Sequence, residues 1–152
     1  MIITLIGDTD YVEQDGHREK LLSVLEEHIG EKVSQLFFCG VGHFEMFTLR
    51  VGREYQKSHP LTALTLILPC HTSDLDPKHL AMLEVFFDHV LEPPHNLFLG
   101  KNSLLRRSKW LLEQTDLVVT HLPCQDESAR QFLACAQELG KPILSLTEPS
   151  NV

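Results

Sequence analysis

Short apolar runs alternate along the chain with segments in which apolar residues recur at helical spacing. The apolar runs predict strands at Ile2–Ile6, Val33–Phe38, Ala63–Leu68, His89–Leu91, Leu117–Leu122 and Pro142–Leu146. The segments between them predict helices at His17–Ile29, Phe44–Gln56, Lys78–Val85, Asn102–Gln114 and Ser128–Leu139. Strands and helices therefore alternate from one end of the chain to the other.

This alternation predicts an α/β fold. Apolar strands separated by helices favour parallel pairing, with helices on both faces of the sheet. The right-handed crossover rule then favours a doubly wound, mainly parallel sheet, a Rossmann-like three-layer sandwich. We expect residues 1–152 to form a single domain, with any ligand bound where the strands reach their carboxyl ends.

Composition narrows the class of protein. The chain has 152 residues, of which 43% are hydrophobic and 22% charged, as expected for one globular domain. No apolar run is long enough to cross a membrane, and no basic leader precedes the first apolar residues, so we expect a cytoplasmic protein. The four cysteines form no C-x-x-C pair and are expected to be reduced thiols. The net charge of -8 opposes general binding of nucleic acid, so we do not expect a nucleic-acid partner.

A Gly-x-Gly turn joins the second predicted strand to the next helix. Gly40 and Gly42 allow the backbone to approach an anion and to adopt positive φ angles. We expect the N–H groups near His43 to Glu45 to face a phosphate. Glu45 would bind ribose hydroxyls or stabilise positive charge developing on a ribose ring. The alternative is a plain strand–helix turn in which Glu45 only complements the helix dipole.

Two further places carry polar side chains near predicted strand ends. Arg106 and Arg107 are adjacent on a predicted helix and therefore point in different directions, so one of them at most reaches a phosphate. The alternative is a solvated face with Trp110 in the core. Ser128 is expected to cap the following helix, and its hydroxyl is a candidate ligand contact.

Cysteine and histidine residues also gather at predicted strand ends. The set consists of Cys39, His43, Cys70, His71, His121 and Cys124. If the strands are neighbours, these side chains converge, and zinc takes such ligands. Their spacing is not that of a known zinc motif, and buried cysteines are ordinary small hydrophobic residues. We therefore assign no metal and no cofactor, and keep a metal or redox site as an alternative.

Taken together, these motifs resemble the YpsA-like branch of the SLOG superfamily, which also holds lonely-guy phosphoribohydrolases and DprA DNA-processing proteins. The resemblance spans nearly the whole chain. The glycine turn of this branch usually reads Gly-Gly-x-Gly-x-Phe-Asp. Gly40, Gly42 and Phe44 match it, with Cys39 in place of the first glycine and Glu45 in place of the aspartate. Arg107 matches the arginine of the branch, and Ser108 replaces its usual asparagine.

Two other turns depart from the pattern of this branch. Gly7-Asp8-Thr9 stands where Gly-His-Arg is usual, and Glu127-Ser128-Ala129 stands where a Gly-Gly-Ala turn is usual. Residues that would contact the same ligand have therefore changed. This implies either an altered ligand or a pocket that has lost catalysis.

The resemblance implies that the chain binds a nucleotide or nucleotide-derived small molecule. The ligand contacts would come from Gly7, Cys39, Gly40, Val41, Gly42, His43, Arg107 and Ser128. If the protein is an enzyme, the resemblance implies hydrolysis of an N-glycosidic bond with Glu45 as the catalytic residue. The alternatives are a sensor or scaffold without chemistry and the metal or redox site described above. A homodimer is the assembly that related proteins often form.

Overall fold

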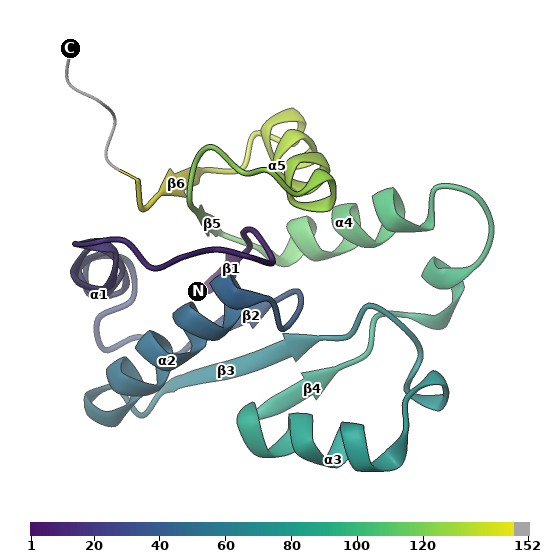
Figure 1. Cartoon of the computed structure of the whole chain (residues 1–152), viewed down its shortest axis with the longest axis horizontal. Helices are drawn as coiled ribbons and strands as arrows, with labels where there is room; N and C mark the ends of the chain where they lie inside the picture. Colours follow the sequence, from purple (N-terminus) through teal and green to yellow (C-terminus); the bar gives the residue numbers. More distant parts are fainter. Residues whose placement is uncertain (148–152) are drawn as a thin grey trace.

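A computed structural model describes residues 1–147 and contains one six-stranded sheet with helices on both faces (Figure 1). The strands are β1 (Ile2–Leu5), β2 (Ser34–Phe38), β3 (Thr62–Ile67), β4 (His89–Leu91), β5 (Leu117–Thr120) and β6 (Ile143–Ser145). The helices are α1 (His17–His28), α2 (His43–Ser58), α3 (Pro77–Phe86), α4 (Ser103–Gln114) and α5 (Glu127–Glu138). Every strand pair is parallel, in the order β4-β3-β2-β1-β5-β6. The predicted doubly wound Rossmann-like fold is confirmed.

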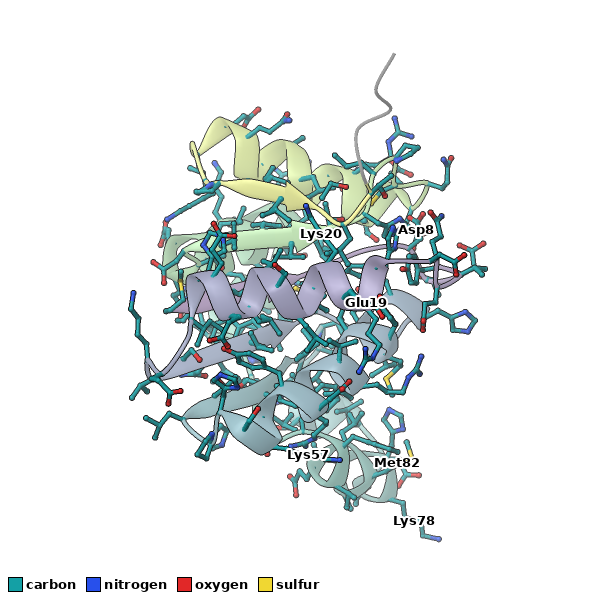
Figure 2. The ribbon with its side chains drawn as sticks, turned by 90° about the vertical axis from the view of Figure 1, so that its left-hand side faces the viewer. Asp8, Glu19, Lys20, Lys57, Lys78 and Met82 are labelled. Atoms are coloured by element: carbon teal, nitrogen blue, oxygen red, sulfur yellow. The ribbon has the colours of Figure 1, made fainter. Side chains whose placement is uncertain are left out.

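Alternate strand residues point to opposite faces of the sheet and build two apolar layers. Ile3 and Leu5 of β1 belong to the layer covered by α1, α2 and α3. Phe37 and Val118 belong to the other layer, which α4 and α5 cover. Figure 1 shows α4 and α5 side by side, and α1 packs against α2. In Figure 2, α1 lies across the front of the sheet with Glu19 and Lys20 on it and Asp8 beside one end.

The sheet grows in two directions from β1. The chain first adds β2, β3 and β4 on one side, and then crosses to place β5 and β6 on the other side. The loops that follow β1 and β5 are therefore neighbours, although more than a hundred residues separate them. Such a switch point leaves a crevice at the carboxyl ends of the strands, which is where open α/β sheets bind ligands.

The predicted elements differ from the observed ones mainly at their ends. Helix α3 begins at Pro77 and is capped by Asp76, whose carboxylate accepts a hydrogen bond from Lys78 N at 3.1 Å. Two short 3-10 helices, Thr72–Asp74 and His95–Phe98, were not predicted, since so few residues carry no periodic pattern. No helix among residues 1–147 is long and apolar enough to span a membrane.

Candidate functional site

A cavity of about 340 Å³ opens at the carboxyl ends of β1, β2 and β3. The loops after these strands form one wall, and α4 with the first turn of α5 forms the other. Its size is within the range of small-molecule sites. The lining includes every predicted site residue except His43, namely Gly7, Cys39, Gly40, Val41, Gly42, Glu45, Arg107 and Ser128.

Glu45 places a carboxyl group in the wall of this cavity. The residue lies in the first turn of α2 and is only 6% exposed, and its Oε1 accepts a hydrogen bond from Gly7 N at 3.4 Å. Burial raises the pKa of Glu45 to about 7, and the negative charges of Asp126 and Asp8 add to this, against the lowering effect of backbone hydrogen bonds. Near neutral pH the carboxyl group is therefore present in both forms, one a donor and the other an acceptor.

The first turn of α2 is not the open anion site that the sequence predicted. His43 N donates a hydrogen bond to Thr9 O at 2.9 Å, and Phe44 N donates to Asp8 O at 3.4 Å. The loop after β1 therefore occupies these donors, and they do not face a ligand. The His43 side chain is exposed and lies outside the cavity lining, so the geometry of the cavity gives no support to its predicted ligand contact, which stays a prediction.

The two glycines of this turn matter because they have no side chain, and not because they adopt a positive φ angle. Neither Gly40 nor Gly42 has a positive φ angle, which corrects the prediction. A Cβ atom on Gly42 would lie 2.9 Å from Thr9 Cα, so the close approach of the two loops requires a glycine. A Cβ atom on Gly40 would meet nothing within 4 Å. Gly40 thus leaves room in the cavity that the protein itself does not fill.

At the N-terminus of α5, unlike that of α2, two backbone N–H groups beside the cavity have no acceptor among the described residues. Asp126 is the N-cap residue, so the prediction that Ser128 caps this helix is wrong. The Asp126 carboxylate turns away from α5 and accepts hydrogen bonds from Thr9 N at 2.8 Å and Thr9 Oγ1 at 2.7 Å. Within residues 1–147, nothing accepts a hydrogen bond from the N–H groups of Ser128 and Ala129, and both residues line the cavity. These are the donors that bind anions at helix N-termini.

Arg107 supplies the positive charge of the cavity wall. Its Nη1 donates to Pro69 O at 2.7 Å, and its guanidinium group lies 5.0 Å from the centre of the Phe98 ring. Arg106 points elsewhere and donates to Leu99 O, so the predicted divergence of the two arginines is confirmed. Arg107 Nε is buried and has no hydrogen-bond partner among the described residues. Trp110 is half-buried; it lines the cavity and also packs against the apolar layer under α4 and α5, so the expectation that it lies in the core holds in part.

Only part of the predicted cysteine and histidine set converges. Among the described residues, Asp8, His121 and Cys124 bring potential metal-ligand atoms within 4.8 Å of one another. Hydrogen bonds already engage these groups: Asp8 N donates to His121 Nε2 at 3.0 Å, and the Cys124 thiol donates to His121 O at 3.0 Å. The Asp8 carboxylate accepts from Gln125 N and Asp126 N at 2.8 and 2.9 Å. A metal ion would have to displace these bonds, so the cluster fits a structural tie between the two loops.

Comparisons with known proteins give a fold and no close relative. No protein-family model and no curated protein sequence matches the chain. DNA processing protein A from Helicobacter pylori matches with a TM-score of 0.63 and 15% identity, over 99% of this chain and 67% of that one. DNA processing protein A (DprA) from Streptococcus pneumoniae matches with a TM-score of 0.61 and 10% identity, over 99% of this chain and 50% of that one. The Helicobacter pylori protein is described as binding single-stranded DNA.

These similarities define the class of protein by its fold. The chain is a Rossmann-like α/β protein with the fold of part of DNA processing protein A, and it spans about half to two thirds of each of those chains. This is the fold that the resemblance to the SLOG superfamily implied. Membership of that superfamily, and of its YpsA-like branch, stays a prediction.

Proposed function

We propose that this protein binds a nucleotide-derived small molecule in the cavity at the carboxyl edge of its sheet. The observation that carries the proposal is that one cavity holds two kinds of group. Ser128 and Ala129, whose N–H groups have no acceptor among the described residues, line one part of it beside the cationic side chain of Arg107. A buried carboxyl group suited to sugar hydroxyls lines another part, at Glu45.

The arrangement assigns a role to each group. The open end of α5 and the Arg107 guanidinium would bind the phosphate, because both favour negative charge. Glu45 would contact the ribose. The open space at Gly40 would admit part of the ligand. This moves the phosphate from the glycine turn, where the sequence placed it, to the opposite wall of the cavity.

If the protein is an enzyme, we propose hydrolysis of the N-glycosidic bond of such a nucleotide. The bond between C1′ and the base nitrogen breaks, water supplies a hydroxyl group to C1′, and its proton goes to the base. Ionised Glu45 would stabilise the positive charge that develops on the ribose ring. A ligand-binding sensor without chemistry is the alternative, and the serine and glutamate that replace the usual late glycines favour it.

Binding can be tested by calorimetric titration with AMP, GMP, CMP and UMP, and then with nucleotide sugars and dinucleotides, with mass spectrometry of the products. We expect saturable binding of at least one member of the panel. Arg107→Met should weaken it about tenfold, since a charge-assisted hydrogen bond is lost. Arg106→Met is the matched control, because it removes the same charge one residue away, outside the cavity lining. Equal effects of the two substitutions would contradict the proposed phosphate site.

Catalysis is tested separately with Glu45→Gln, which keeps the shape of the side chain and removes its charge. Turnover should disappear while nucleotide binding persists. Turnover that survives the substitution would remove Glu45 from the reaction. Binding without product in the wild-type protein would assign the sensor function instead.

A further inference from the structure

Two aspartates of this chain start helices from nearly the same backbone conformation but do different things. Asp76 begins α3 with φ -61° and ψ 130°, and its carboxylate caps the helix by accepting from Lys78 N. Asp126 begins α5 with φ -64° and ψ 129°, and its carboxylate makes no cap hydrogen bond. Since a carboxylate at this position ordinarily accepts from the second or third N–H of its helix, something outside α5 must hold Asp126 away.

Thr9, in the loop after β1, holds the Asp126 carboxylate. Its backbone N–H and its hydroxyl both donate to Asp126 Oδ2, at 2.8 and 2.7 Å. These two hydrogen bonds also lower the pKa of Asp126, which keeps the side chain ionised and firmly bound to Thr9. The backbone of the same loop is fixed from the other side, because the Asp8 carboxylate accepts from Gln125 N and Asp126 N.

The donors that an Asp126 cap would consume are those of Ser128 and Ala129, the second and third residues of α5. Both line the cavity, together with Thr9 and Asp126. The Asp126 carboxylate and a ligand phosphate would therefore compete for the same N–H groups. The cavity wall also holds the buried carboxyl of Glu45 and the cationic side chain of Arg107, so the open helix end is not an isolated feature.

We infer that Thr9 is a positioning residue that keeps the start of α5 open for an anion by restraining the Asp126 carboxylate. The inference rests on the proposed nucleotide site. Thr9 would not need to contact the ligand itself. It would act by preventing the Asp126 carboxylate from capping the helix. Asp126 would then be a built-in competitor of the ligand whenever Thr9 releases it.

Substituting the two partners of this hydrogen bond separates the inference from a purely structural tie. Thr9→Val removes the hydroxyl donor and leaves only the backbone N–H to hold the Asp126 carboxylate. We expect the best-binding nucleoside monophosphate to bind up to about tenfold more weakly, because the less restrained carboxylate then competes for the N–H groups of α5. Asp126→Ala removes the competitor and a negative charge, so we expect binding about two- to fivefold tighter. The double variant should bind as tightly as Asp126→Ala alone. A structural tie predicts instead that both single variants bind more weakly, and that result would overturn the inference.

A readout without ligand keeps this test independent of the proposed function. In ¹⁵N-labelled protein, Thr9→Val should shift the amide protons of Ser128 and Ala129 and slow their exchange with solvent, because they gain an acceptor. Asp126→Ala should leave both amides exchanging as in the wild type. If the wild type binds no nucleotide but these amides respond as stated, the proposed function fails and the inference about Thr9 stands. Amides that ignore Thr9→Val would overturn the inference whatever the ligand.

Discussion

Glu45 carries a carboxyl group that the fold buries in the wall of the cavity. It is held in the wall of the cavity by its place on α2, with Gly7 N–H as a hydrogen-bond donor. Burial raises its pKa to about 7, so the folded protein binds a proton there that the unfolded chain has already lost. The stabilising effect of this proton is present below the unfolded pKa near 4.5 and is lost as the pH rises toward 7.

Because the folded protein holds this proton and the unfolded chain does not, the stability of the wild type should fall as the pH rises. Between pH 5 and pH 8, the free energy of unfolding of the wild type should fall by about 2–3 kcal/mol relative to that of Glu45→Gln, which cannot ionise. Urea denaturation at the two pH values measures the difference. The exposed Glu27→Gln serves as the control and should track the wild type. Parallel pH profiles for the wild type and Glu45→Gln would show that the carboxyl group is solvated.

Two glycines of the cavity wall should respond in opposite ways to alanine. A Cβ atom on Gly7 would collide with the Phe44 ring and lie 2.7 Å from His121 Cδ2, so Gly7→Ala should lower stability by about 1–3 kcal/mol. Gly40→Ala meets no neighbour and should leave stability unchanged while it weakens nucleotide binding roughly tenfold. Thermal unfolding and calorimetric titration of both variants measure this. Loss of stability in Gly40→Ala would mean that the position serves packing.

At the scale of elements, Asp88 joins the edge of the sheet to α2. Its carboxylate accepts from Arg53 Nη1 at 2.8 Å, Gln56 Nε2 at 2.7 Å and Leu64 N at 2.8 Å. Burial alone would raise the pKa of Asp88, but these hydrogen bonds outweigh it and lower the pKa. The stabilisation is therefore present above the unfolded pKa and is lost as the pH falls through the folded one.

We predict that Asp88→Ala lowers the free energy of unfolding by about 2 kcal/mol at pH 7, because it leaves Leu64 N and the Arg53 charge without their acceptor. Denaturation at pH 7 and at pH 3 measures it, and the difference from the wild type should shrink at the lower pH. The exposed Asp10→Ala is the control. A deficit that is equally large at both pH values would contradict the ionic origin of the effect.

The elements themselves were predictable because their signal is local. Apolar periodicity indicated each helix and strand to within a few residues, and the alternation indicated the sheet. The glycine turn and Arg107 were also found from sequence. The bond between Thr9 and Asp126 was not, since it joins residues 117 positions apart and depends on how two loops meet at the switch point. The loop after β1 also accepts the hydrogen bonds of the first N–H groups of α2, and no local sequence pattern reveals this contact.

At the scale of the whole molecule, the acidic balance of the chain leads us to predict weak binding of nucleic acid. The net charge is -8, whereas binding to a nucleic-acid strand depends on neutralising its phosphates with basic residues. We propose that residues 1–152 act as one domain with a small-molecule pocket, and the homodimer implied by the resemblance stays a prediction that light scattering can measure.

The corresponding prediction concerns single-stranded DNA, which the Helicobacter pylori neighbour is described as binding. A fluorescent oligothymidine should show a dissociation constant weaker than about 100 μM at physiological salt, because few basic residues oppose the acidic surface. Anisotropy titration at several salt concentrations measures it. Micromolar binding with a steep dependence on salt would assign the chain to strand binding and not to a pocket ligand.

Chemical-shift mapping tests the central claim, which is that a nucleotide occupies the cavity with its phosphate at the start of α5. Titrating ¹⁵N-labelled protein with the four nucleoside monophosphates should move the amide resonances of Gly40, Glu45, Ser128 and Ala129, together with Arg107 Nε, in a saturable manner. Inorganic phosphate should move the α5 and Arg107 signals without those of Gly40. Saturable shifts confined to other surfaces, or none with any nucleotide, would contradict the account.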